Sequence, residues 1–173
     1  MSNQAEFWLS GPIEGITPML QPVAHAILQA QREIKEALSD FPDDLLRVRP
    51  GGVASPAFHL QHIAGVLDRL FTYARGEQLS PAQFDYLKKE GQEDEKLKLP
   101  ELISHLDLQV EAALKQLRET PSSQIPEPRF VGRKQIPSSV LGLLFHAAEH
   151  MQRHTGQLLV TVRVLRSGTD GQT

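Results

Sequence analysis

The sequence predicts an all-α fold, and three observations lead to that prediction. Apolar residues recur every three or four positions along most of the chain, which is the spacing of one helix face. No segment sustains the alternation of apolar and polar residues typical of a half-buried strand, so strands are not expected. Prolines stand where the periodic segments begin, as they do at helix starts. Four main helices, with one long connector between the second and the third, indicate a four-helix bundle with a crossover.

The first two main helices are predicted from periodicity and from their end signals. The first spans residues 18–39, and its apolar positions are Leu20, Val23, Ile27, Ile34 and Leu38. The second begins at Ser55-Pro56, where the hydroxyl caps the helix and proline takes the first helical position. It runs to about Ala74 and stops at Gly76.

A connector and a third main helix follow. Residues 81–90 are predicted to form a short helix inside the connector, and the mixed charges of residues 88–98 indicate a solvated segment. The third main helix opens at Pro100 and ends before Pro121, with apolar residues on one stripe.

The last helix is preceded by a proline-rich segment. Residues 120–137 contain four prolines and are predicted to be a loop. Ser138 or Ser139 caps the helix, which continues to residue 166.

The composition predicts one cytoplasmic domain over residues 1–173, with an irregular lead-in at 1–17 and a flexible tail at 167–173. The formal net charge of −3 gives no attraction to nucleic acid, and no apolar run approaches the roughly 20 residues of a membrane span. We therefore expect neither nucleic acid nor a membrane as a partner. The chain has no cysteine, so any metal must be bound by His, Asp or Glu.

The last predicted helix carries His146, His150 and His154, spaced by four residues. Histidines at i and i+4 lie one turn apart on one face, so two imidazoles can converge on one ion. All three cannot, because the outer two lie about 12 Å apart along the axis. The helical wheel places His150 and His154 within or beside the inward stripe, which favours that pair. The histidines of the first and third helices, His25 and His105, are predicted to be solvated.

A third ligand has to come from another helix, and the second helix offers His59 and His62. His59 is closer to the apolar stripe, whereas His62 flanks it on the side shared with Arg69 and Tyr73. Periodicity slightly favours His59 for the interior, but it does not decide which of the two is the ligand.

Two strings of residues extend this interpretation. The second helix contains Ser55-Pro-Ala-Phe-His-Leu-Gln-His62-Ile-Ala-Gly, and the last contains His146-Ala-Ala-Glu-His150-Met-Gln-Arg-His154-Thr-Gly-Gln157. Together they resemble the motifs of the DinB/YfiT-like metalloenzyme family. The order of the helices and the long connector also fit, so the resemblance covers nearly the whole chain.

The resemblance implies a bundle in up-down-down-up order, often a homodimer, with a divalent ion at one end. The family's three-histidine site corresponds to His62, His150 and His154, which decides between His59 and His62. Three neutral imidazoles leave coordination positions open, as catalytic sites do. We expect the ion to be Zn or Ni.

Some members of the family are thiol-dependent transferases or isomerases, so the resemblance implies a metal-dependent transferase or hydrolase. We favour an S-transferase that uses a low-molecular-weight thiol. Arg69 and Tyr73 are candidates to bind an anionic group or to donate a proton, and Gln157 to orient a ligand from one turn beyond His154. For each of these three the alternative is a packing or surface role. The alternative function is a non-catalytic metal or small-molecule binding protein.

Overall fold

The computed structural model describes residues 5–92 and 96–170, and this part of the chain is mostly helical, as the sequence predicts. The α-helices are α1 (Gln21–Ala37), α2 (Pro56–Ala74), α3 (Pro81–Lys89), α4 (Leu99–Glu119) and α5 (Val140–Asp170). Short 3-10 helices precede α1 at Phe7–Leu9 and Pro18–Leu20, follow it at Asp43–Leu45 and Pro50–Gly52, and follow α4 at Ser122–Gln124.

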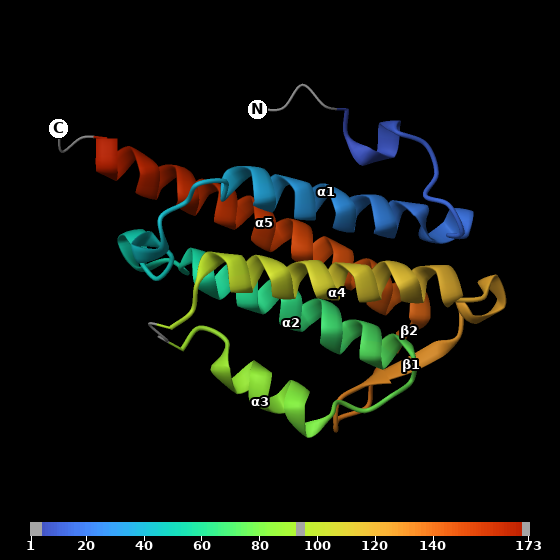
Figure 1. Ribbon diagram of the computed structural model, residues 1–173. Helices are drawn as coiled ribbons and strands as arrows, with labels where there is room; N and C mark the ends of the chain where they lie inside the picture. Colours follow the sequence, from blue (N-terminus) through green and yellow to red (C-terminus); the bar gives the residue numbers. More distant parts are fainter. Residues whose placement is uncertain (1–4, 93–95, 171–173) are drawn as a thin grey trace.

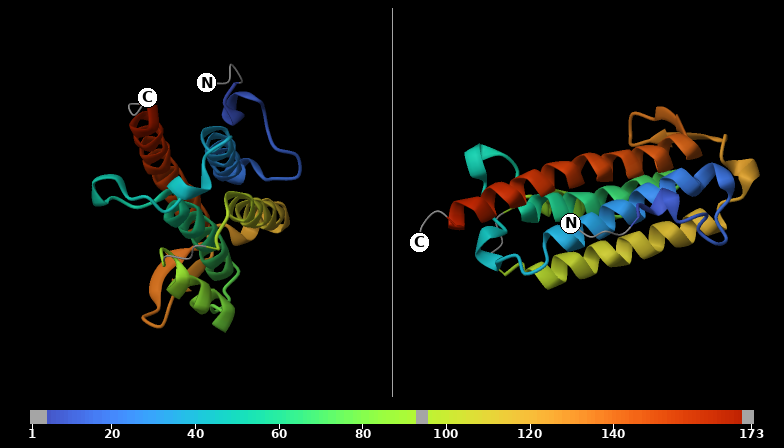
Figure 2. Two further views of the ribbon diagram at one scale, coloured as in Figure 1. Left: turned by 60° about the vertical axis from the view of Figure 1, so that its left-hand side comes forward. Right: turned by 90° about the horizontal axis from the view of Figure 1, so that it is seen from above.

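The four long helices pack side by side around the apolar core (Figure 1). In Figure 1, α2 and α4 run in one direction and α1 and α5 in the other. Both α1 and α2 contact both α4 and α5. The left view of Figure 2 looks nearly along the helices and shows α3 on the outer side of α2. None of the helices in the described part of the chain combines the length and the apolar character needed to cross a membrane.

Helix α2, which carries two of the candidate histidines, begins and ends as its sequence predicts. The hydroxyl of Ser55 accepts a hydrogen bond from the backbone N–H of Phe58 at 3.3 Å, and proline follows Ser55. At the other end Gly76 has φ +81°, a left-handed conformation that glycine adopts without steric cost. The N–H of Glu77 then reaches the carbonyl of Thr72 at 3.2 Å, which closes a Schellman motif.

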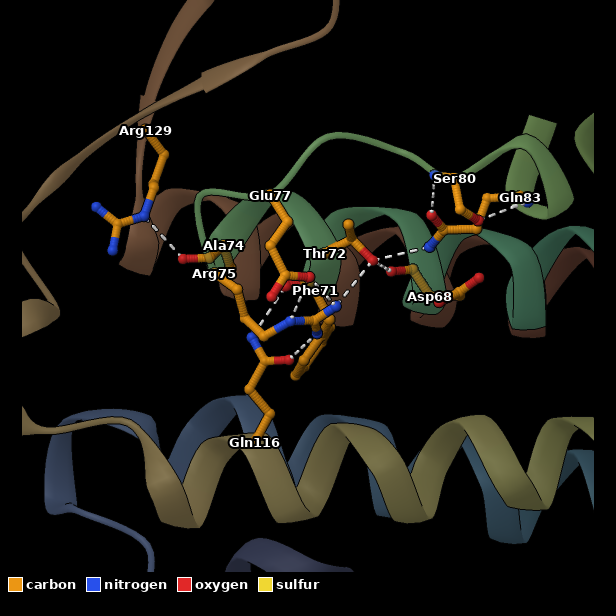
Figure 3. A network of polar contacts seen from close by, with 10 residues as sticks. All are labelled: Asp68, Phe71, Thr72, Ala74, Arg75, Glu77, Ser80, Gln83, Gln116 and Arg129. Carbon is orange, nitrogen blue, oxygen red and sulfur yellow. Dashed lines mark hydrogen bonds and ion pairs between the residues drawn. The ribbon is translucent and has the colours of Figure 1, made fainter.

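A polar network surrounds the C-terminal end of α2 (Figure 3). The Thr72 hydroxyl donates to the carbonyl of Asp68 at 2.8 Å and accepts from Gln83 Nε2 at 2.8 Å and from Arg75 Nη2 at 3.2 Å. Arg75 Nη1 donates to Gln116 of α4 at 2.5 Å. We call these residues the Thr72 network; it ties the end of α2 to both α3 and α4.

Helix α3 and the residues after it are held against α2. A capping box between Ser80 and Gln83 opens α3. The Tyr86 hydroxyl donates to the carbonyl of Gln61 at 3.1 Å, and the N–H of Gly91 donates to the side-chain oxygen of Gln61 at 3.2 Å. The connector is therefore anchored on α2 as far as Gly91, which corrects the expectation that it is simply solvated there.

A two-stranded antiparallel hairpin, β1 (Pro128–Val131) and β2 (Ile136–Ser139), lies where the sequence predicts a loop. The prediction that the fold needs no strands was therefore wrong. Strands of four residues are too short to show alternation. A proline such as Pro137 is tolerated because each strand of a two-stranded ladder is an edge strand. Arg129 Nε of β1 donates to the carbonyl of Ala74 at 2.8 Å, so the hairpin packs on the end of α2.

Helix α5 is longer than predicted. Ser139 caps it, because its hydroxyl accepts from the N–H of Gly142 at 3.0 Å. The helix continues past residue 166 to Asp170, so residues 167–170 of the predicted flexible tail are helical. A lone glycine such as Gly168 costs a helix only about 1 kcal/mol and does not by itself end it. The remaining tail residues, 171–173, lie outside the described residues.

Candidate metal centre

Three histidines from two helices meet in the space between α2 and α5. His62 comes from α2, and His150 and His154 come from successive turns of α5. One nitrogen from each ring can be chosen so that all three atoms lie within 4.8 Å of one another. The Nε2 atoms of His62 and His150 are 2.9 Å apart. We call these three residues the histidine cluster.

Each ring of the histidine cluster contacts the other two. The centroids of His62 and His154 lie 4.5 Å apart, those of His150 and His154 4.6 Å, and those of His62 and His150 5.1 Å. The spacing of four residues on α5 places two rings on one face, and the packing of α5 against α2 supplies the third. All three rings are half-buried.

Burial favours the neutral form of the α5 imidazoles. The pKa of His154 is lowered to about 4, first by burial and then by the neighbouring His62, His150 and His59. The pKa of His150 is lowered as well, again mainly by burial. Neutral imidazole is the form that binds a metal ion, because its lone pair must be free. These two rings are therefore available to a cation at neutral pH.

One nitrogen of the cluster lacks a partner. Among the described residues, His150 Nδ1 is the one buried side-chain nitrogen or oxygen without a hydrogen-bond partner. Buried polar atoms are almost always satisfied, and an exception needs an explanation such as an ion or a water molecule. The other nitrogen of this ring, Nε2, faces His62, so the convergence of the three rings is the feature that fits a bound transition-metal ion.

The other two rings are supported by different partners. His62 Nδ1 lies 2.8 Å from Oε2 of Glu90, whose side chain is only 5% exposed. Arg69 Nη1 donates to the other oxygen of the same carboxylate. Burial alone would raise the pKa of Glu90, but the hydrogen bonds from His62 and Arg69 lower it below its usual value. Glu90 is therefore an ionised, buried carboxylate.

On the other side of the cluster, His59 supports His154. Their Nδ1 atoms are 3.1 Å apart. His59 is 2% exposed, and burial, with a smaller effect of His62, lowers its pKa to about 4. Periodicity correctly indicates that His59 faces the interior. The structure places it beside the histidine cluster rather than among the three converging rings.

The remaining histidines do not join the cluster. His146 is exposed; its Nδ1 lies 3.4 Å from Glu149, and its ring contacts that of His150. The expectation that His105 is solvated was wrong, because it is half-buried and its Nδ1 lies 3.2 Å from the hydroxyl of Tyr86. His25 is half-buried too, with Nε2 3.0 Å from the carbonyl of Gly11.

The three candidate catalytic residues lie in different places. Arg69 is buried and is linked to the cluster through Glu90. Gln157 is exposed, one turn beyond His154. Tyr73 is eleven residues from His62 on the same helix, or about 16 Å along the axis, and packs in the core near the hairpin. The structure does not bring Tyr73 to the histidines.

Sequence reasoning missed Glu90. It lies in the stretch of mixed charges that is expected to be solvated, 28 residues from His62. Its only sequence signal is that an acidic residue follows the end of a short helix, and that signal does not identify a buried partner.

The family model of the DinB superfamily matches residues 26–158, which include the whole histidine cluster and Glu90. A conserved protein from Enterococcus faecalis has a similar fold, with a TM-score of 0.69, 16% identity, and coverage of 86% of this chain and 97% of that one. A protein from Streptococcus pneumoniae gives a TM-score of 0.64 at 14% identity, with 86% and 90% covered. No curated protein matches. Because the family model covers most of its length, the chain belongs to the DinB superfamily.

Proposed function

We propose that this protein is a metal-dependent enzyme whose histidine cluster binds one divalent ion, Zn or Ni. The observation that carries the proposal is the convergence of His62, His150 and His154, whose ligand atoms lie within 4.8 Å of one another. Three imidazoles favour Zn, Ni, Cu or Fe over Mg or Ca, which prefer oxygen ligands. A site with three protein ligands leaves coordination positions for water or substrate.

We also propose that the four long helices constitute an up-down-down-up bundle that functions as a rigid frame. Their directions in Figure 1 support this order. In such a frame the ligands sit on helices rather than on loops, which fixes their separation. The resemblance also implies a homodimer. This stays a prediction, which a measurement of the mass in solution can test.

The reaction that we propose is the transfer of a low-molecular-weight thiol to an electrophile. A bound divalent ion supplies Lewis-acid chemistry, which lowers the pKa of a thiol or water ligand. The chain has no cysteine, so the sulfur has to come from a cosubstrate. The thiol sulfur forms a bond to the electrophilic carbon. The leaving group departs with the electron pair of the broken bond, and the thiol proton passes to solvent.

Among the chain's own groups, Gln157 is the candidate best placed to contact such substrates. It is exposed, on the same helix as His154 and one turn beyond it. Arg69 already pairs with Glu90, so we assign it a supporting role rather than substrate binding. We leave Tyr73 out of the proposed site because of its distance from His62.

The test begins with the metal content of protein purified without a histidine tag. We expect one ion per chain in the wild type and none in His62→Ala or His154→Ala. His146→Ala is the matched control, because His146 lies on the same helix outside the cluster; it should keep the ion. A wild type that stays metal-free after reconstitution with Zn and Ni would contradict the proposal.

A screen of small thiols against electrophiles then tests the reaction. We expect thiol consumption that requires the metal and is lost in His154→Ala.

The second candidate function is non-catalytic metal or small-molecule binding. The observation that favours it is the partial burial of all three rings, which limits the room for a substrate beside a bound ion. Full metal occupancy without an exchangeable water ligand would support this second function.

A further inference from the structure

We propose that Glu90 is a positioning residue: it selects the tautomer of His62 and orients its ring so that Nε2 faces the other two histidines. This inference rests on the proposed metal site. It goes further because it assigns a specific role to a residue outside the three histidines, on a different segment of the chain.

The hydrogen bond between Glu90 and His62 determines where the proton lies. An ionised carboxylate only accepts hydrogen bonds, so at 2.8 Å from Oε2 the Nδ1 atom of His62 must carry the hydrogen. In the neutral form, which is the form that binds a metal ion, the imidazole has a single N–H, so Nε2 then carries the lone pair. That atom is the one that lies 2.9 Å from Nε2 of His150. The donor is therefore turned toward Glu90 and the lone pair toward the cluster.

Glu90 is itself held in place from two sides. Arg69 binds its second oxygen, so the carboxylate is fixed by two charged or polar donors. The N–H of Glu90 donates to the carbonyl of Tyr86 at 3.1 Å. This bond fixes the backbone of Glu90 at the end of α3, from where the carboxylate reaches His62 on α2.

The backbone of α2 leaves room for this ion pair at one glycine. A Cβ atom on Gly65 would collide with the carboxylate of Glu90 and the guanidinium of Arg69, and would lie 2.9 Å from the Tyr86 ring. The absence of a side chain at Gly65 thus lets the pair lie directly on the helix. Glycine in a helix interior is otherwise unfavourable by up to about 1 kcal/mol. The close approach of Glu90 and Arg69 explains why a glycine stands here.

The two supported rings of the cluster differ in the charge of their partners. His154 contacts the neutral ring of His59, whereas His62 contacts a carboxylate. A carboxylate behind an imidazole raises the basicity of the ligand nitrogen and restrains the ring, and loss of such a partner weakens metal binding about 10- to 100-fold. We therefore expect His62 to depend on Glu90 more than His154 depends on His59.

Zinc affinity, measured by competition with a chromophoric chelator at pH 8, provides the first test. We expect Glu90→Ala to weaken zinc binding about 10- to 100-fold and Glu90→Gln, which keeps an acceptor but loses the charge, to weaken it less. The matched control is Glu149→Gln: Glu149 adjoins His150 in sequence but bonds Arg153 and His146 instead of the cluster. It should change affinity by at most about threefold. Equal losses in Glu149→Gln and Glu90→Gln would overturn the proposal.

The second test uses the metal-free wild type and therefore does not depend on how the variants fold. Nitrogen chemical shifts of the His62 ring at pH 8 should report a hydrogen on Nδ1, the less common tautomer of free histidine. Arg69→Gln should keep this tautomer, because it leaves the bond between Glu90 and His62 in place. A hydrogen on Nε2 in the wild type would overturn the role of Glu90. A wild type that shows the expected tautomer but binds no zinc would overturn the proposed function instead.

Discussion

The two ends of α2 differ in whether the polar groups around them all have hydrogen-bond partners. At the C-terminal end the Thr72 hydroxyl uses its donor and two acceptor positions, and Arg75 bonds to Thr72, Glu77 and Gln116 (Figure 3). In the N-terminal half His62 belongs to a cluster in which a buried nitrogen of His150 has no partner. One helix therefore contributes to a saturated network and, together with α5, to a cluster that has an unpartnered nitrogen.

This difference separates structural polar groups from groups that await a ligand. A saturated network stabilises the fold and has no free lone pair to offer. An unsaturated cluster costs free energy by itself, because a buried polar atom without a partner loses about 1–3 kcal/mol. A change at one end of α2 should therefore leave the other end unaffected.

The largest expected effect is stabilisation by zinc. At a free ion concentration about 1,000 times the dissociation constant, binding to the folded state adds about 4 kcal/mol to the free energy of unfolding. Urea denaturation with zinc and with a chelator measures it. The variant Thr72→Val should keep the full increment and His154→Ala should lose it. Equal zinc stabilisation of wild type and His154→Ala would show that the ion binds elsewhere.

The next effect is loss of stability in acid, for the metal-free protein. The pKa of His59 and of His154 is lowered to about 4 from 6.5, so the unfolded chain binds more protons below pH 6.5. Stability is therefore complete above pH 6.5 and falls as the pH approaches 4. His59 alone contributes on the order of 3 kcal/mol to this fall. Denaturation at a series of pH values should show a shallower slope in His59→Gln. An equal slope in that variant would contradict the assignment.

A smaller effect is expected at the C-terminal end of α2. Gly76→Ala places a side chain at φ +81°, where an L-residue costs roughly 1–2 kcal/mol. The free energy of unfolding should drop by that amount, while zinc affinity stays within about twofold of the wild type because the cluster is distant. A tenfold loss of zinc affinity would mean that the two ends of α2 are coupled.

The smallest effect concerns the Thr72 hydroxyl. Thr72→Val removes one donor and two acceptor contacts and leaves Gln83 and Arg75 able to reach solvent, so we expect a loss of about 1 kcal/mol. Thr72→Ser keeps the hydroxyl and is the control. Thermal unfolding of both variants distinguishes the loss of the hydroxyl from the loss of the methyl group. A destabilised Thr72→Ser with an unchanged Thr72→Val would contradict the role of the hydroxyl.

Features with a local cause were predictable from the sequence. The bounds of α2 follow from Ser55-Pro56 and Gly76, whose capping roles depend on neighbouring residues only. The pair His150 and His154 follows from helical spacing. In contrast, the choice of His62 over His59 needed the family resemblance, because the wheel favours His59 for the interior and the structure indeed buries it.

Features that depend on distant segments were not predictable. The hairpin forms because two short strands pair with each other, and neither has a pattern of its own. Glu90 looks like one more charge in a polar stretch until α3 places it against α2. Tyr73 shares a helix face with His62, but a shared face says nothing about a separation of three turns along the axis.

The sequence separation within the histidine cluster has a consequence for the integrity of the molecule. His62 and His150 are 88 residues apart, in a protein without cysteine. An ion shared between them would be a staple across a long loop, the kind of link that restricts chain entropy most in theory. If the backbone were cut between α2 and α5, each fragment would keep part of the donor set. The ion would then link the two fragments in addition to the packing of α5 against α1 and α2, so a chelator should weaken the association of a nicked molecule.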